Sequence, residues 1–248
     1  MSDKKINPKH VVITPLLMYE RYGWMNYDLF LWLQSSPVDY YRRHQMNFSV
    51  CPAHNFHPAP AARNVAGKMF LETDAEWLLM IDNDMAPPDN LLDMIVNAGP
   101  DRDIIIPVMF MWDNKRGQVF LCWKPVSQYS EKGEWTLDDE QPYQELLTGG
   151  TGAIAIRRRV LENMPYPWFQ YEYSENYELI TSEDVWFTGR ARAAGFKTWG
   201  YTKAPCGHFH SVDLLKIPPR VDPLTDEKKS KETFPLDRPH TRPEKPQT

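Results

Sequence analysis

Two aspartates that directly follow an apolar run are the first residues of this sequence suited to chemistry. Asp82 and Asp84 flank Asn83, and the preceding run Trp77–Ile81 has the pattern of a buried strand in a mostly parallel sheet. In open α/β sheets, ligands bind in the crevice at the carboxyl ends of such strands. Residues two apart in an extended segment point to the same face, so the two carboxylates can share one divalent cation. The alternative is a polar turn leading into Ala86-Pro87-Pro88, because Asp and Asn are common turn residues.

Further candidate ligands lie near position 208. Cys206, His208 and His210 alternate, which fits either metal binding or one face of a strand that carries a hydrogen-bonded histidine. Carboxylates suit Mn²⁺ or Mg²⁺, and one imidazole among the ligands favours Mn²⁺.

Two acidic residues and one arginine complete the set of charged candidates. Glu183 and Asp184 lie in the first turn of a predicted helix, where the helix dipole alone can account for them. Arg63 can hold two phosphate oxygens at once, or it can form a surface salt bridge. The glycine-rich stretch Thr148–Gly152 lets the backbone approach a ligand closely, or makes a tight hairpin corner.

The elements that must position these residues alternate between strands and helices, which predicts an α/β fold with a mostly parallel central sheet flanked by helices. Between Met109 and Leu147, short alternating pieces such as Gln118–Trp123 and Glu134–Leu137 predict a smaller antiparallel extension. An aromatic loop is expected over Tyr166–Tyr177. The expected strands are His10–Pro15, Asn47–Val50, Trp77–Ile81, Asp103–Val108, Ala153–Arg157 and Thr198–Tyr201, and the expected helices are Asn26–Gln34, Ala61–Thr73, Asp89–Ala98, Arg159–Met164 and Ser182–Ala194.

Length, charge and cysteine content narrow the class of protein. The 248 residues suit one α/β domain with a tail, and the net charge of −5 argues against a broad basic face for nucleic acid. Three widely spaced cysteines indicate neither a disulfide framework nor a four-cysteine zinc site, which favours a reducing, cytoplasmic location. We see no signal peptide and no apolar run long enough for a membrane span.

The last part of the chain differs in composition. From residue 217 onward, proline and charged residues dominate without apolar periodicity, and residues 216–248 contain eight Lys/Arg against six Asp/Glu. We therefore expect a domain over residues 1–216 and a tail over residues 217–248, either disordered or wrapped around the body.

The order of these signals resembles that of the nucleotide-sugar-dependent glycosyltransferases of the GT-A fold, especially the family 2-like group, over roughly residues 10–212. The matching stretches are Ala62-Arg63-Asn64, the DxD motif Asp82-Asn83-Asp84, the turn Gly149-Gly150-Thr151-Gly152, Ser182-Glu183-Asp184-Val185 with the following Arg190–Phe196, and a late histidine, His208 or His210.

The resemblance implies a GT-A-like, Rossmann-like fold and a role for each matching residue. It implies that Asp84 and His208, or His210, bind Mn²⁺ or Mg²⁺, while Asp82 reaches the ribose or the ion. It implies a general base at Asp184, with Glu183 as the second choice. Donor contacts are implied for Thr14, Pro15, Arg63, Asn64 and the Gly150 turn, the last of which touches the donor sugar or the acceptor.

The implied activity is metal-dependent transfer of a sugar, a hexosyl group, from a nucleotide diphosphate donor to a hydroxyl acceptor. The donor implied is UDP-linked, and a divalent ion would neutralise the charge that develops on the leaving diphosphate. Glycan, small-molecule, protein, lipid and modified-nucleobase acceptors all stay open, as do inverting and retaining chemistry. The alternatives are a nucleotidyltransferase on a similar scaffold and a non-catalytic nucleotide- or carbohydrate-binding protein.

Overall fold

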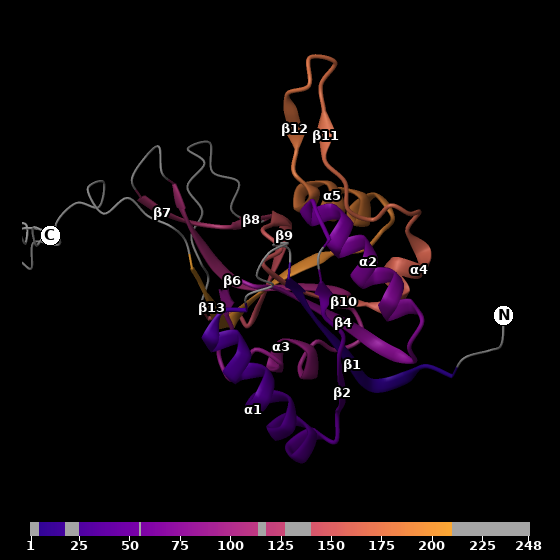
Figure 1. The fold of residues 1–248 in the computed structure, drawn as a ribbon, viewed down its shortest axis with the longest axis vertical. Coiled ribbons are helices and arrows are strands. Elements are labelled where there is room, and N and C mark those ends of the chain that lie inside the picture. Colours follow the sequence, from indigo (N-terminus) through magenta and orange to yellow (C-terminus); the bar gives the residue numbers. More distant parts are fainter. Residues whose placement is uncertain (1–4, 18–24, 55, 114–117, 127–139, 210–248) are drawn as a thin grey trace, which may run out of the picture.

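A large mixed sheet with helices on both faces forms the body of the protein (Figure 1). The computed structural model describes residues 5–17, 25–54, 56–113, 118–126 and 140–209. Helices α1 (Tyr27–His44) and α3 (Asp93–Val96) lie on one side of the sheet. Helices α2 (Ala59–Leu71), α4 (Arg158–Asn163) and α5 (Glu183–Ala193) lie on the other.

The sheet is mostly parallel, with one reversed strand near its centre. Strands β2, β1, β4, β6 and β13 run in one direction, and β10 lies antiparallel between β4 and β6. Strands β9 and β8 continue the sheet in antiparallel fashion beyond β13. In spatial order the strands are β2 (Asn47–Val50), β1 (Asn7–Leu17), β4 (Ala75–Asp82), β10 (Ala153–Arg157), β6 (Ile104–Asp113), β13 (Thr198–His208), β9 (Tyr143–Gly149) and β8 (Trp123–Pro125). The expected fold class, including its smaller antiparallel extension, is thereby confirmed.

Short strands attach to the ends of the long ones. Strand β3 (Ala53–His54) pairs with β1, β5 (Met85–Ala86) with β13, and β7 (Gln118–Leu121) with β6. The pairing of β5 with β13 joins the segment directly after Asp84 to the segment that carries His208. The topology thus brings two distant candidate stretches to one place.

The apolar runs seen in the sequence form the core because they are sandwiched between two helical layers. Every residue of Val11–Ile13, Leu78–Ile81, Ile104–Ile106 and Ile154–Ile156 has no exposed side-chain surface. Strands buried on both faces need apolar residues at every position, whereas half-buried strands alternate. Asp82 is the last residue of β4, so it lies where this buried strand reaches the edge of the sheet.

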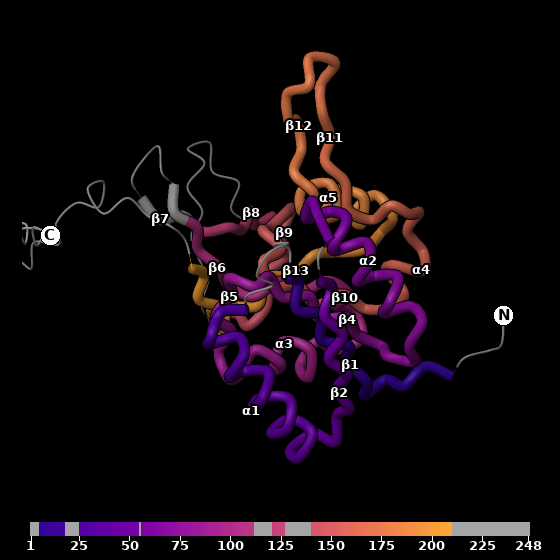
Figure 2. The backbone as a smooth tube through the Cα atoms, in the orientation of Figure 1, coloured from indigo at the N-terminus to yellow at the C-terminus, as the bar shows by residue number. Residues whose placement is uncertain are grey.

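The stretch expected as an aromatic loop, Tyr166–Tyr177, contributes β11 (Glu172–Tyr173) to a separate two-stranded hairpin whose other strand, β12 (Leu179–Thr181), follows it. Figures 1 and 2 show it projecting from the body next to α5. The prediction of an irregular loop was therefore incomplete, since part of the stretch pairs with the residues just before α5.

Other boundaries also differ from the expected ones. Strand β1 continues past Thr14-Pro15 to Leu17, and α1 runs on to His44 with Pro37 inside it. The helix expected over Asp89–Ala98 shrinks to Asp93–Val96, and the last strand extends from Tyr201 to His208. Glu134–Leu137, His210 and the tail from residue 217 lie outside the described residues.

Candidate functional site

The acidic turn after β4 is held from two sides. The backbone N–H of Asp82 donates to Gly152 O at 2.7 Å, which ties the turn to the start of β10. Asn26, the N-cap of α1, donates its backbone N–H to Asn83 O and its side-chain Nδ2 to Met85 O, both at 3.0 Å. The turn is therefore fixed between the glycine-rich stretch and the beginning of α1.

The carboxylates of Asp82 and Asp84 are close enough to affect each other electrostatically, and each has one oxygen without a hydrogen bond among the described residues. Oδ1 of Asp82 and Oδ1 of Asp84 are both buried, and neither has a hydrogen-bond partner within the described part of the chain. Burial raises the pKa of Asp82 to about 6, against the opposing effect of Arg63 and with the help of Asp84. Buried oxygens without a donor are costly, so this pair is suited to a cation.

Arg63 links three parts of the site from within α2. Its guanidinium is almost completely buried, and Nη2 donates to Asp82 Oδ2 at 3.0 Å while Nη1 donates to Thr151 O at 3.0 Å. Nε lies 3.7 Å from Glu183 Oε1. The guanidinium thus orients Asp82, the glycine-rich turn and the start of α5 relative to one another, and the reading as a surface salt bridge is wrong.

His208 lies beside Asp84. Its Nε2 is 3.4 Å from Asp84 Oδ2, and its Nδ1 is 3.2 Å from Phe110 O. The hydrogen bond with Asp84 is the main cause that raises the pKa of His208. The backbone N–H of Phe209 also donates to Asp84 O at 2.9 Å, so β13 and the acidic turn are joined next to the carboxylate.

The described residues fit a metal that takes part of its ligands from elsewhere. Over the described ranges, no three His, Cys, Asp or Glu side chains are grouped closely enough to hold an ion by themselves. Mg²⁺ and similar ions are often held by one or two carboxylates together with water and substrate phosphates. The unpartnered oxygens of Asp82 and Asp84 fit that mode, with His208 adjacent.

The two candidate bases occupy different surroundings at the start of α5. Glu183 is mostly buried and faces Arg63, whereas Asp184 Oδ1 accepts from Val185 N at 2.8 Å and from the Ser182 hydroxyl. Asp184 is partly exposed. A carboxylate held by local donors and open to solvent is better placed to receive an acceptor hydroxyl than one paired with a buried arginine.

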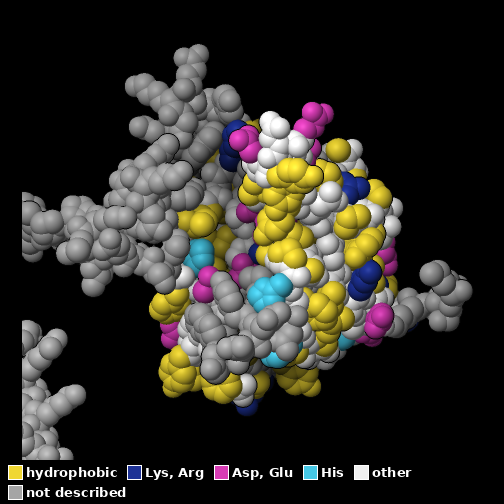
Figure 3. Space-filling view, turned by 45° about the horizontal axis from the view of Figure 1, so that its top comes forward, with side chains coloured by type: hydrophobic (Ala, Val, Ile, Leu, Met, Phe, Trp, Pro, Cys, Tyr) yellow, Lys and Arg dark blue, Asp and Glu magenta, His cyan; other side chains and the backbone are white. Residues whose placement is uncertain are grey.

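Cys122 lies close to both the glycine-rich turn and Asp184. Gly150 N donates to Cys122 O at 2.8 Å, and a Cβ at Gly150 would lie 3.2 Å from Cys122 Cβ. Burial, with a smaller contribution from the nearby Asp184 charge, raises the pKa of the Cys122 thiol to about 12. Figure 3 shows acidic side chains recessed between walls of the molecule, with histidine side chains nearby.

Three residues expected to contact the donor, Thr14, Pro15 and Asn64, are buried within the fold. Leu16, and not Thr14 or Pro15, is in register with Asp82, so both expected residues lie buried within β1 below the edge. The Asn64 amide binds the backbone of Trp168 and Phe169 through three hydrogen bonds of 2.8–3.2 Å and so anchors the aromatic loop. Nucleotide contacts from these residues stay predictions.

The sequence reasoning missed Asn26 as part of the site and, within the predicted glycine-rich turn, the contact of Thr151 with Arg63. Asn26 had a readable signal, since asparagine before an amphipathic helix is a strong N-cap. Thr151 contributes its backbone oxygen to Arg63, a role that leaves no mark on residue type.

Comparisons with known proteins add fold likenesses only. No family model matches the sequence, and no curated protein matches it either. Among solved structures, the chain is similar to A197 from STIV at 17% identity and a TM-score of 0.46, over 82% of this chain and 86% of that one. It is similar to GalNAc-T7 with UDP, GalNAc and Mn²⁺ at 11% identity and a TM-score of 0.49, over 84% and 45% of the two chains.

A third likeness is to S. aureus TarS 1-349 in complex with UDP-GlcNAc, at 16% identity and a TM-score of 0.43, over 82% of this chain and 59% of that one. Glycosyltransferases are thus among the solved structures that this fold resembles. The chain spans roughly half the length of these two. All three TM-scores lie below 0.5, so these likenesses concern the fold and carry no information on function. Among the helices that the structure describes, none has the length and apolar character of a membrane span.

Proposed function

We propose that this protein transfers a sugar from a nucleoside diphosphate donor, UDP-linked by preference, to a hydroxyl acceptor with the aid of Mn²⁺ or Mg²⁺. The observation that carries the proposal is the pair of buried, unpartnered oxygens on Asp82 and Asp84 at the carboxyl edge of a mostly parallel sheet. Such a pair needs positive charge, which a divalent cation would supply, and a diphosphate would add further oxygen ligands to that cation.

The residues of the chain divide the work between binding and proton transfer. Asp82 and Asp84 would hold the cation, with His208 at its side, and a cation held there would supply positive charge to the leaving diphosphate. Arg63 keeps Asp82 ionised and in place, because its guanidinium donates to Oδ2 and leaves Oδ1 open.

Asp184 is the general base of this proposal. As the acceptor oxygen attacks the anomeric carbon, its proton passes to the Asp184 carboxylate, and the bond from that carbon to the diphosphate breaks. Glu183 is the weaker candidate because its side chain is mostly buried and its Oε1 lies 3.7 Å from Arg63 Nε, which leaves it less open to an acceptor.

The first test is calorimetric titration of UDP, GDP and their sugar conjugates with and without Mn²⁺. The native chain is compared with Asp84→Ala and with Asp89→Ala, an exposed carboxylate on the following loop that serves as the matched control. We expect Mn²⁺-dependent binding of one nucleotide in the native chain and in Asp89→Ala, and its loss in Asp84→Ala. Absence of binding to every nucleotide in folded native protein would refute the proposal.

The second test separates transfer from binding alone. Nucleoside diphosphate release from the bound sugar conjugate is measured with acceptor mixtures, in native protein and in Asp184→Asn. Loss of a general base slows a reaction by about 10²–10⁴-fold, whereas nucleotide binding should persist. An Asp184→Asn protein with native turnover would eliminate Asp184 as the base, and formation of a nucleotide sugar from a nucleoside triphosphate would identify a nucleotidyltransferase instead.

A further inference from the structure

Helix α1 carries apolar residues on two opposite faces. On its inner face, Leu29, Trp32 and Tyr40 are buried against the body of the protein. On its outer face lie Tyr27, Phe30, Leu31, Val38 and Tyr41, with exposed fractions between 45% and 70%. We call these five residues the outer stripe. An ordinary surface helix is apolar on one face only, so the outer stripe is surplus to this fold.

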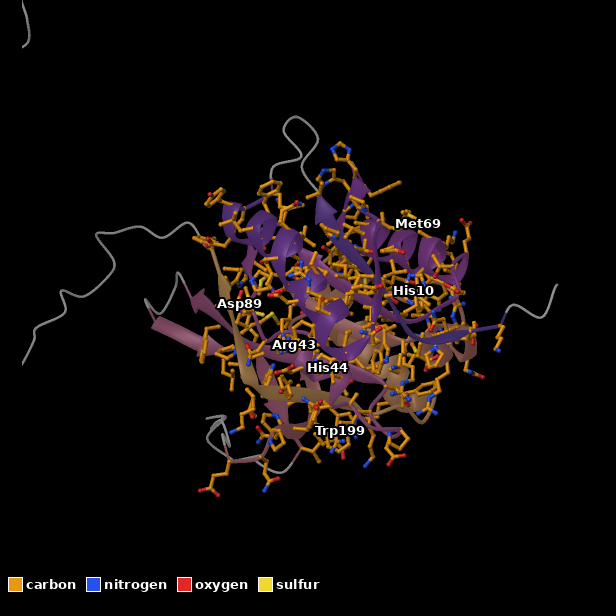
Figure 4. The ribbon with its side chains drawn as sticks, turned by 90° about the horizontal axis from the view of Figure 1, so that it is seen from below. His10, Arg43, His44, Met69, Asp89 and Trp199 are labelled. Atoms are coloured by element: carbon orange, nitrogen blue, oxygen red, sulfur yellow. The ribbon has the colours of Figure 1, made fainter. Side chains whose placement is uncertain are left out.

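The outer stripe has the spacing of a helix–helix seam. Positions 27, 31, 34, 38 and 41 follow one another at intervals of four, three, four and three, the repeat with which two helices pack along each other. At about 100° per residue, the stripe covers an arc of roughly 100°. Gln34, at its centre, is the one polar residue in the series. Figure 4, seen from below, shows α1 across the near side, with Arg43 and His44 labelled at its end.

An open groove runs beside the outer stripe. It has a volume of about 420 Å³ and is lined by Asp28, Leu31, Trp32 and Ser35 of α1, by Ala86 of β5, and by Pro87 and Asp89 of the following loop. Its lining combines apolar residues, among them Leu31, Ala86 and Pro87, with the carboxylates of Asp28 and Asp89, so it can take a side chain with an apolar stem and a polar or basic end. The stripe and the groove together form one continuous surface for a partner helix.

The arrangement of residues along α1 matches a second copy of the same helix in the opposite direction. Tyr27 and Tyr41 are equally distant from Gln34, and so are Phe30 and Val38. A two-fold axis at Gln34 therefore places aromatic residues opposite each other at both ends and Phe30 opposite Val38. Such a pairing is self-complementary, as a two-fold symmetric contact requires.

The charges at the two ends of α1 select the same direction. Asp28 lies in the first turn and is exposed, while Arg42 lies in the last turn and is also exposed. Antiparallel helices bring Asp28 of one copy near the last turns of the other, where Arg42 and Arg43 outnumber the one acidic residue, Asp39, which lies 3.8 Å from Arg42. Parallel helices bring Asp28 of one copy near Asp28 of the other. Opposed helix dipoles add to this preference. We propose that α1 is the interface of a two-fold symmetric dimer of this chain, with its two copies antiparallel and crossing near Gln34.

The expected affinity follows from the small size of the contact. The segment from Tyr27 to Tyr41 is about 22 Å long at 1.5 Å per residue. A single helix pair with a neighbouring groove is at the low end of specific interfaces, so we expect a reversible dimer with a dissociation constant of the order of ~1–100 µM. This proposal is independent of the proposed function.

Analytical ultracentrifugation of the full chain from about 1 to 200 µM tests the proposal in the concentration range that this estimate sets. We expect a monomer–dimer equilibrium in the native chain and a monomer in the double variant Leu31→Glu, Val38→Glu. The matched control is Leu179→Glu, Ile180→Glu, which places the same charges on two exposed apolar residues of the β11–β12 hairpin and should leave the dimer intact. A native chain that stays monomeric throughout, or a dimer unaffected by the α1 variant, overturns the proposal.

A charge exchange tests the antiparallel pairing. Asp28→Arg and Arg42→Asp should each weaken the dimer by about tenfold or less, as expected of exposed ion pairs, and the double exchange should restore it. A single Gln34→Cys should cross-link two copies on mild oxidation, while Tyr27→Cys alone should not, although it should cross-link to Tyr41→Cys in a mixture. Cross-linking of Tyr27→Cys to itself would show parallel helices and refute the arrangement.

Discussion

Replacement of Arg63 by methionine is the perturbation that most directly tests how the site is held together. Methionine keeps the length and apolar character of the side chain but removes the guanidinium. Asp82 then loses its donor at 3.0 Å, Thr151 O loses its donor at 3.0 Å, and Glu183 loses the nearby charge at 3.7 Å. Arg63 is 2% exposed, so water cannot replace these contacts without a rearrangement.

The cost is that of breaking a buried ion pair from one side. Removal of one partner leaves the other charge buried and uncompensated, which costs about 3–5 kcal/mol. For a protein of this size, that corresponds to a fall in melting temperature of about 6–20 °C. The matched control is Lys197→Met, because Lys197 is 2.9 Å from Glu145 but mostly exposed, and surface ion pairs contribute about 0–1 kcal/mol.

The free energy of unfolding should be measured by urea titration followed by circular dichroism, without added metal or nucleotide. We expect Arg63→Met to be destabilised by several kcal/mol and Lys197→Met to stay within about 1 kcal/mol of the native chain. If both variants lie within that margin, the contacts of Arg63 with Asp82, Thr151 and Glu183 do not hold the site together.

Three further predictions concern packing, titration and capping. Gly200→Ala should destabilise the fold by about 1–3 kcal/mol, because the new Cβ would lie 2.6 Å from the buried Trp123 ring. Gly189→Ala, in helix α5 with open space around the new Cβ, should stabilise the fold by up to about 1 kcal/mol. Urea titration of both variants checks this. Burial raises the pKa of the Cys206 thiol from 9.0 to about 12, so its contribution to stability is complete below pH 9 and declines as the pH rises towards 12. Between pH 8 and pH 10, the free energy of unfolding should therefore fall less steeply with pH in Cys206→Ser than in the native chain. Equal slopes would argue against the shift. Asn26→Ala removes the N-cap of α1 and should cost about 1–2 kcal/mol; a loss below 0.5 kcal/mol would contradict its role at the acidic turn.

The elements that the sequence predicts best are those whose burial leaves a simple pattern. Strand β4 was readable because a strand covered on both faces must be apolar throughout, and its end at Asp82 followed directly. Strand β13 was predicted to end too early, at Tyr201. Its residues 202–207 do alternate between buried and exposed, and Pro205, a residue that disfavours strand interiors, lies at an exposed position.

The helix expected over Asp89–Ala98 shows why apolar spacing alone is insufficient. Its backbone instead forms three-residue turns, such as Asp93 N to Asn90 O at 3.0 Å, and the Asn90 side chain donates to Lys203 O on β13. These contacts depend on a strand more than 100 residues away. Tertiary contacts of this kind override local helical preference.

Most residues of the candidate site could be predicted from the sequence, but the contacts between them could not. Asp82, Asp84 and His208 were expected together, and the structure places His208 next to Asp84. That Arg63 would contact Asp82 and Glu183 could not be read from the sequence, because a lone arginine on a helix is equally suited to the surface. Only the packing of α2 on β4 decides which way the side chain points.

The reversed strand β10 has a consequence for synthesis of the chain on the ribosome. The two neighbours of β4 in the sheet are β1, which precedes it, and β10, which begins at residue 153. Until residue 153 has emerged, one edge of the apolar strand β4 has no hydrogen-bonding partner, although the residues of the acidic turn at its end have already been synthesised. An open edge of this kind is prone to pair with other chains. We therefore expect nascent chains that stall between β4 and β10 to depend on chaperones, and the acidic turn to acquire its native shape only after Gly152 arrives.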